Sequence, residues 1–152
     1  MSNKKNNENK YDCLKLENQI CFPLYASSNL VIKRYKPLLD NLKLTYTQYI
    51  TMMVLWEHKQ INVKNLGEKL FLDSGTLTPL LKKLESKGYV KRERSKDDER
   101  NLIVSITEEG EKLKEKALKI PEKMCESVRL SKEEFEGLYN VLYKLLNSDK
   151  EE

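Results

Sequence analysis

The sequence predicts a mainly α-helical protein with one small β-ribbon. Apolar residues recur at helical spacing in several segments between residues 14 and 147, and two capping signals mark helix starts. Alternating apolar residues at 102–106 follow a basic, strand-like segment at 89–95. The 152 residues, 34% charged and 39% hydrophobic, have the length and polarity of one soluble domain.

The composition argues against several classes of protein. No segment approaches the roughly 20 apolar residues that span a bilayer, and residues 1–10 lack the apolar core of a signal peptide. We therefore expect a cytoplasmic protein, with a disordered tail over residues 1–10 and one domain over 11–152. Three scattered cysteines, one histidine and no CxxC pair favour free thiols and argue against a disulfide framework, a metal site or a bound cofactor.

The first helix is predicted from about residue 14 to Tyr35, just before Lys36 and Pro37. Pro23 has no backbone N–H and clashes with the carbonyl of the preceding turn. The helix therefore either kinks there or begins near Phe22. In both cases Cys21 lies at a perturbed or initial helical turn.

The central part of the chain predicts a helix-turn-helix. A helix starts at Thr45, where Gln48 completes a capping box, and ends near His58, to which we assign no role. A short helix begins at Asn62, and after a tight turn a longer helix runs to Lys87. Two short helices joined by such a turn are typical of a helix-turn-helix.

The longer of these two helices has a leucine stripe for the core and a polar face. The outward residues are Ser74, Thr76, Thr78, Lys82 and Lys83. Small hydroxyls allow close approach to DNA and can hydrogen-bond phosphates or base edges, although a capped surface helix would show the same pattern. Pro79 lies inside this helix, where we expect a local distortion.

Two strands joined by the charged residues 96–100 predict a projecting hairpin, or wing. The segment from residue 73 to residue 96 contains seven basic and three acidic residues, while the rest of the chain has no net charge. This excess favours a phosphate-binding surface, with a solvated lysine-rich face as the alternative. The candidate phosphate contacts are Lys82, Lys83, Lys91, Arg92 and Arg94. Together these features predict a winged helix-turn-helix domain over about 45–107.

The remaining helices are expected to form a dimerisation domain over about 14–40 and 108–147. One helix should run from Thr107 to Ile120 and stop at Pro121, and a capping box at Ser131 starts the next. A winged helix needs only half of the chain, so these apolar faces have little core left to cover. A two-fold dimer would present two reading helices to a palindromic DNA site.

Several segments resemble known regulators. Residues 73–85, 97–100 and 103–110 resemble the MarR family of dimeric winged-helix transcription regulators. Residues 16–22 and the segments Tyr25–Ser28, Tyr35–Leu39 and Thr45–Tyr46 resemble the OhrR-type repressors within it, which sense organic hydroperoxides.

The OhrR resemblance implies that Cys21 is the peroxide sensor. It implies that Tyr35 and Tyr46 hydrogen-bond the sensor thiolate from the partner subunit, and that Tyr25 belongs to the same pocket. A thiolate attacks a peroxide O–O bond, and phenolic donors beside a helix start favour that thiolate. From the residues alone, an inert apolar cysteine remains the alternative for Cys21.

The MarR resemblance implies that Arg100 in the wing enters the DNA minor groove. Asp98 is included among the candidate DNA-binding residues, and a salt bridge to Asp98 is one alternative role for Arg100. Cys125 resembles the C-terminal cysteine of two-cysteine OhrR proteins, which captures the oxidised sensor of the other subunit as a disulfide. We place Cys125 in a mobile connection, with a small cellular thiol as the competing resolving partner and a buried structural cysteine as the alternative. Pro23 departs from the single-cysteine members, and Cys13 has no counterpart.

The leading hypothesis is a homodimeric DNA-binding repressor that leaves its operator when organic hydroperoxide oxidises Cys21. One alternative is a regulator of the same fold that responds to a small phenolic or lipophilic ligand, or to broader oxidative signals. Another is a thiol peroxidase in which Cys21 and Cys125 are catalytic, which leaves the basic helix and wing without a role.

Overall fold

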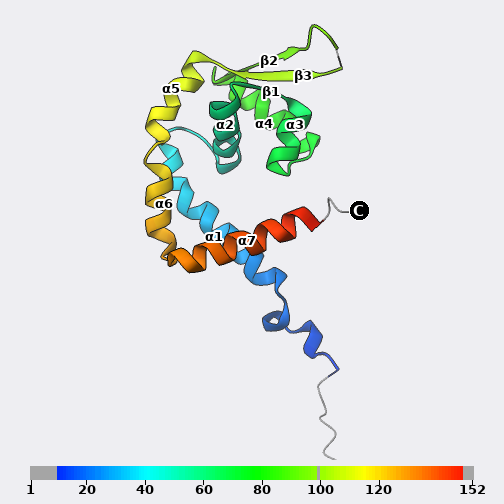
Figure 1. Cartoon of the computed structure of the whole chain (residues 1–152), viewed down its shortest axis with the longest axis vertical. Coiled ribbons are helices and arrows are strands. Elements are labelled where there is room, and N and C mark those ends of the chain that lie inside the picture. The colour runs from blue at the N-terminus through cyan, green and yellow to red at the C-terminus, as the bar shows by residue number, and fades with distance from the viewer. Residues whose placement is uncertain (1–9, 99, 149–152) are drawn as a thin grey trace, which may run out of the picture.

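The computed structural model describes residues 10–98 and 100–148 and is mainly helical with a small antiparallel sheet, which confirms the predicted fold class (Figure 1). The expected tail over residues 1–10 lies, except for Lys10, outside the described residues. The elements in chain order are two 3-10 turns, η1 (Asp12–Leu14) and η2 (Leu16–Asn18), then α1 (Cys21–Asp40), α2 (Tyr46–His58), β1 (Gln60–Asn62), α3 (Val63–Leu70), α4 (Ser74–Ser86), β2 (Val90–Arg94), β3 (Leu102–Ile106), α5 (Glu108–Ala117), α6 (Ile120–Val128) and α7 (Lys132–Asn147).

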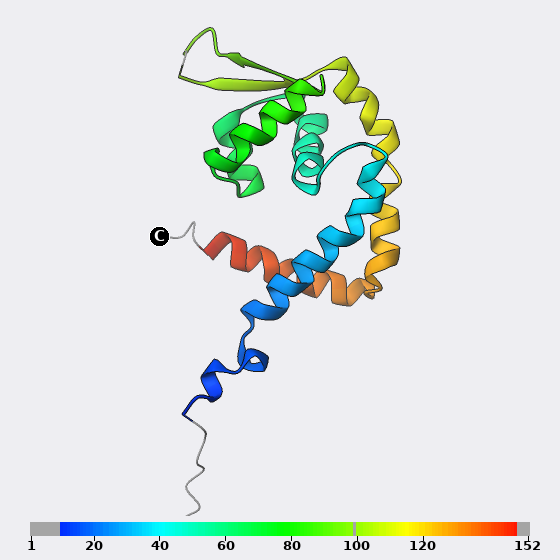
Figure 2. The ribbon, with the colours of Figure 1, turned by 180° about the vertical axis from the view of Figure 1, so that it is seen from behind.

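The chain forms a compact lobe with long helices extending from it. Helices α2, α3 and α4 pack against one another beneath the sheet, and α4 lies in front of α3 and beside α2 when the molecule is seen from behind (Figure 2). Helices α5 and α6 run down one side of the molecule, while α7 and the first part of α1 lie away from the lobe (Figure 1). The last turns of α1 reach the lobe, where Leu39 is buried in the core. Among the described residues, none of the helices is long and apolar enough to cross a membrane.

The sheet has the strand order β1-β3-β2, with both pairs antiparallel. Strands β2 and β3 form the predicted wing hairpin, in which Arg92 pairs with Val104. Strand β1 was not predicted, because three residues are too few to show an alternating pattern. It forms where Ile61 pairs with Val104, which lies more than 40 residues further along the chain.

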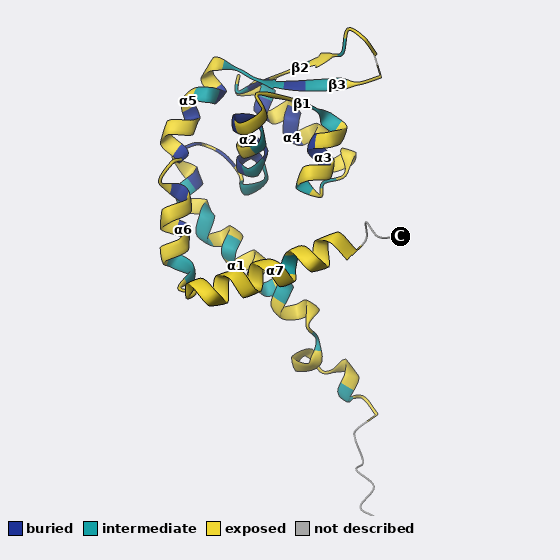
Figure 3. Ribbon diagram, viewed as in Figure 1, coloured by how far each residue is buried: buried dark blue, intermediate teal, exposed yellow. Residues whose placement is uncertain are grey.

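The predicted leucine stripe of α4 is buried, as Leu77, Leu80, Leu81 and Leu84 all lie in the core. They pack with Met52, Leu55 and other buried residues of the lobe. By contrast, none of the described residues of α7 is buried in the single chain (Figure 3).

Helix α1 begins at Cys21, so the prediction that this residue occupies an initial turn is confirmed. Pro23 fits there because the first-turn N–H groups have no helical partner in any case. The predicted end at Tyr35 is wrong, because α1 continues through Pro37 to Asp40. Pro37 removes one backbone hydrogen bond, and the burial of Leu39 in the core compensates for it.

Two other prolines lie inside helices. Pro79 lies within α4, which is continuous from Ser74 to Ser86 and has a buried leucine stripe, and the local distortion expected at Pro79 stays a prediction. Pro121 does not end a helix: α5 stops at Ala117, and Pro121 lies in the first turn of α6, where its fixed φ suits a helix start. Cys125 therefore lies within α6 and not in a mobile connection, which corrects that expectation.

Candidate redox and nucleic-acid-binding sites

The proposed sensor thiol lies on an open surface. Cys21 is the first residue of α1 and is exposed in the single chain. Tyr25 follows one turn later on the same face of the helix and is 68% exposed. The neighbouring Ile20 and Phe22 are exposed as well. The sensor end of α1 is thus an uncovered, largely apolar surface.

Tyr35 and Tyr46, which the OhrR resemblance assigns to the sensor thiol, form a separate cluster. The ring of Tyr35 on α1 lies 4.8 Å from that of Tyr46, the first residue of α2, and 5.9 Å from that of Tyr49. Burial, with smaller contributions from Tyr46, Tyr49 and Cys125, raises the pKa of Tyr35 to about 12. Burial also raises the pKa of Tyr46. Both phenols therefore keep their protons at neutral pH and can donate hydrogen bonds.

Cys125 lies on α6, which packs against α1. Its thiol makes the smallest of the contributions that raise the pKa of Tyr35. Helix α6 is held against α1 by Arg34, whose Nη1 donates to the carbonyl oxygen of Ser127 at 2.7 Å. The exposed thiol of Cys125 is therefore carried by a helix that is fixed against α1.

A single chain does not bring Cys21 to this cluster. Cys21 and Tyr35 lie 14 residues apart on one continuous helix, which separates them by about 21 Å along its axis. The structure therefore brings Tyr35 and Tyr46 together, with Cys125 on the adjacent helix α6, and leaves the Cys21 thiol and Tyr25 on a distant surface.

The second candidate site is the exposed face of α4. Its outward residues Ser74, Thr76, Thr78, Lys82 and Lys83 are all exposed, as the sequence predicted. Asp73 caps the helix: its Oδ1 accepts from the Thr76 N–H and its Oδ2 from the Thr76 hydroxyl, both at 2.9 Å. These hydrogen bonds from Thr76 lower the pKa of Asp73. Since its proton is committed to Asp73, the Thr76 hydroxyl is left as a hydrogen-bond acceptor.

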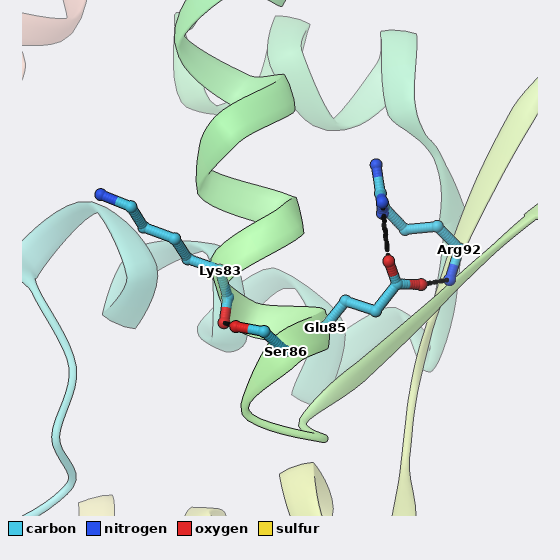
Figure 4. A network of polar contacts seen from close by, with 4 residues as sticks. All are labelled: Lys83, Glu85, Ser86 and Arg92. Atoms are coloured by element: carbon cyan, nitrogen blue, oxygen red, sulfur yellow. Dashed lines mark hydrogen bonds and ion pairs between the residues drawn. The ribbon is translucent and has the colours of Figure 1, made fainter.

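Arg92 braces the wing against α4 and does not project outward. Its Nε and Nη2 donate to Glu85 Oε2 at 2.9 and 2.6 Å, and its backbone N–H donates to Oε1 at 2.9 Å (Figure 4). Its side chain is only 19% exposed, and its hydrogen bonds lower the pKa of Glu85. Arg92 therefore has a structural role, which corrects the prediction that it contacts phosphate. In the same view Lys83 points away from this pair.

The wing tip is shaped by Asp98. Its Oδ1 accepts from the Arg100 backbone N–H and its Oδ2 from Asn101 Nδ2, both at 3.0 Å. Asp98 thus holds the turn that presents the exposed Arg100. Of the other predicted basic residues, Lys91 forms an exposed ion pair with Glu93, and Arg94 is exposed at the end of β2.

Sequence reasoning missed two residues that organise these sites, Arg34 and Glu85. Each lies on a helix and looks like part of a solvated face, and their partners come from other elements. The seven-residue spacing of Glu85 and Arg92 across the turn at Gly88 was the only local signal. Among the residues that the structure describes, no group of three or more His, Cys, Asp or Glu side chains could hold a metal ion.

Comparison with known proteins places this chain among transcription regulators. A family model for transcriptional regulators of the SarA/Rot type matches residues 33–117. The organic hydroperoxide resistance transcriptional regulator of Bacillus subtilis is 52% identical over 141 residues, which are 93% of this chain and 96% of that protein.

Solved structures agree with this assignment. Reduced AbfR bound to DNA has a TM-score of 0.74 at 35% identity, covering 91% of this chain and 96% of that one. AbfR comes from Staphylococcus epidermidis, and its disulfide-formed structure has a TM-score of 0.63 at 36% identity, covering 90% and 96%. These similarities decide against the alternative of a thiol peroxidase. The chain belongs to the MarR-type winged-helix transcription regulators, in the group of organic hydroperoxide resistance regulators.

Proposed function

We propose that this protein is a cytoplasmic, homodimeric repressor that binds double-stranded DNA and releases its pseudo-palindromic operator when an organic hydroperoxide oxidises Cys21. The observation that carries the proposal is the separation of Cys21 from the tyrosine cluster. A second copy of the chain can place its own Cys21 beside Tyr35, Tyr46 and Cys125, which the first copy cannot do itself. The relatives are a hydroperoxide resistance regulator and a protein solved in reduced, DNA-bound and disulfide forms.

The exposed apolar surfaces support the dimer. The sensor end of α1 exposes Ile20, Phe22, Tyr25 and Leu30. Helix α7 exposes a second apolar surface, formed by Phe135, Leu138, Tyr139, Val141, Tyr143, Leu145 and Leu146 (Figure 3). A soluble monomer rarely leaves patches of this extent uncovered, and two-fold symmetry covers both at once.

The chemistry uses two successive steps at sulfur. The Cys21 thiolate attacks one peroxide oxygen, so that an S–O bond forms, the O–O bond breaks and the leaving alkoxide takes a proton to become an alcohol. The resulting sulfenic acid is then attacked by the Cys125 thiolate of the partner. An S–S bond forms, the S–O bond breaks, and the departing hydroxide takes a proton from solvent to become water. Tyr35 and Tyr46 act as phenolic donors to the sensor sulfur.

The proposed function is tested by titrating DNA with reduced protein and with protein treated with one equivalent of cumene hydroperoxide. Oxidation should weaken binding by about a hundredfold, which corresponds to about 2.7 kcal/mol of coupling. Dithiothreitol should restore the affinity. A regulator should consume oxidant stoichiometrically, in contrast to the steady turnover of a peroxidase. Unchanged DNA affinity after complete oxidation of Cys21 would overturn the proposal.

Arg100→Ala should weaken binding most strongly where the wing meets A·T-rich DNA. A narrow A·T-rich minor groove concentrates negative potential, so an inserted arginine discriminates by groove width. We expect a loss of about tenfold on A·T-flanked sites and a smaller loss on G·C-flanked sites. Lys82→Ala is the matched control, because a phosphate contact should affect both sites equally and flatten the salt dependence by about 0.9 in logarithmic slope. Equal losses for Arg100→Ala on both sites would make it another phosphate contact.

A further inference from the structure

One lysine joins the end of the DNA-reading helix to the start of the helix that carries Tyr46. Lys87 is the C-cap residue directly after α4. Its Nζ donates to the backbone oxygen of Lys43 and, at 3.0 Å, to Oε1 of Gln48. Partial burial of the ammonium, and secondarily the charge of Lys83, lowers the pKa of Lys87. Lys87 is an exposed residue, but its ammonium is bonded to one oxygen of the α1–α2 connection and one of α2.

The acceptor of this contact is part of the helix cap at the tyrosine cluster. Gln48 is only 3% exposed, and its Oε1 also accepts from the Thr45 N–H at 3.2 Å. In return, the Gln48 N–H donates to the Thr45 hydroxyl oxygen at 3.3 Å. This reciprocal cap starts α2 at Tyr46, whose ring lies 4.8 Å from that of Tyr35. A shift of Tyr46 therefore moves the oxygen that Lys87 holds.

The other side of Lys87 leads to the DNA-binding surface. Two residues earlier, Glu85 holds Arg92 of the wing through three hydrogen bonds. Lys82 and Lys83 lie on the preceding turn, with their side chains exposed. The end of α4 is thus linked to the wing by Glu85 and to the first turn of α2 by Lys87.

We propose that Lys87 couples the redox state of the tyrosine cluster to the position of α4, acting through Gln48 and Lys43 and not through contact with DNA. This inference rests on the proposed function. When oxidation rearranges Tyr35 and Tyr46, the cap at Thr45 moves, and Lys87 carries α4 and the wing with it. Without the ammonium, the two helices retain only their apolar contact, and oxidation no longer repositions the reading helix.

The test compares Lys87→Met with Lys83→Met in DNA titrations of the reduced and the cumene hydroperoxide-treated protein. The ratio of oxidised to reduced Kd should fall at least about tenfold in Lys87→Met, while the reduced Kd and its salt slope stay near wild type. Lys83→Met should keep the ratio and lose about 0.9 in salt slope. Lys87→Arg, which can still donate to both oxygens, should retain the ratio. The inference is overturned if Lys87→Met keeps the wild-type ratio of oxidised to reduced Kd. It is also overturned if Lys87→Met flattens the salt dependence of DNA binding and leaves that ratio unchanged.

Amide hydrogen exchange provides a readout that does not depend on oxidation. Coupling between binding sites is reciprocal, so DNA binding at α4 should slow exchange of the Gln48 and Tyr49 amides in the first turn of α2. This protection should appear in wild type and in Lys83→Met, and disappear in Lys87→Met. If wild type keeps its DNA after oxidation, the proposed function fails, and the exchange data still decide the role of Lys87. Equal protection in Lys87→Met and wild type overturns the coupling.

Discussion

Cys21→Ser should bind DNA as tightly as the reduced wild-type protein and should lose the whole response to organic hydroperoxide. Serine fills nearly the same space and retains a hydrogen-bonding group, but its oxygen cannot be oxidised to a sulfenic acid. Because Cys21 is exposed at the start of α1, the substitution removes no core packing. The expected result is the disappearance of a roughly hundredfold oxidised-to-reduced difference in Kd, measured by fluorescence anisotropy with a labelled operator.

Cys13→Ser is the matched control for this experiment. Cys13 is another exposed thiol, lies eight residues earlier in η1 and is separated from α1 by a second 3-10 turn. We expect its serine variant to respond to hydroperoxide as wild type does. A Cys21→Ser variant that still releases DNA on oxidation, or a Cys13→Ser variant that does not, would move the sensor role away from Cys21.

Cys125→Ser should abolish the covalent dimer that forms when the wild-type protein is oxidised. A disulfide requires Cα atoms within about 7 Å, but Cys21 starts α1, whereas Cys125 lies on α6, which Arg34 holds against the later half of α1. We therefore expect the partner's Cys21 to be the one that pairs with Cys125. Oxidised wild type should migrate as a dimer on a non-reducing denaturing gel, and Cys125→Ser should migrate entirely as a monomer.

Mass spectrometry then identifies what replaces the disulfide in Cys125→Ser. We expect a sulfenic acid at Cys21 in the absence of other thiols, a mixed disulfide when a small thiol is added, and a sulfinic acid under excess peroxide. The Cys13→Ser variant should still form the covalent dimer. If oxidised wild type remains monomeric on the gel and carries a small thiol on Cys21, the protein is a one-cysteine sensor despite Cys125.

The sequence by itself determined the elements whose signals are local. The capping boxes at Thr45 and Ser131 both form as predicted, because each depends on side chains three residues apart. The leucine stripe of α4 and the wing strands follow equally from short-range periodicity. The same patterns place the exposed hydroxyls and lysines of α4 on one face. Fold class and the predicted DNA-binding face could therefore be read from the sequence.

Only the tertiary structure decided which side chains become partners across elements. Strand β1 exists because β3 offers it a paired edge, and α1 passes Pro37 because Leu39 is buried in the core. Arg92 and Lys87 look alike in sequence as exposed cations, yet one holds Glu85 and the other holds Gln48. These choices arise from packing between segments far apart in the chain, where the burial of apolar surface outweighs local preference.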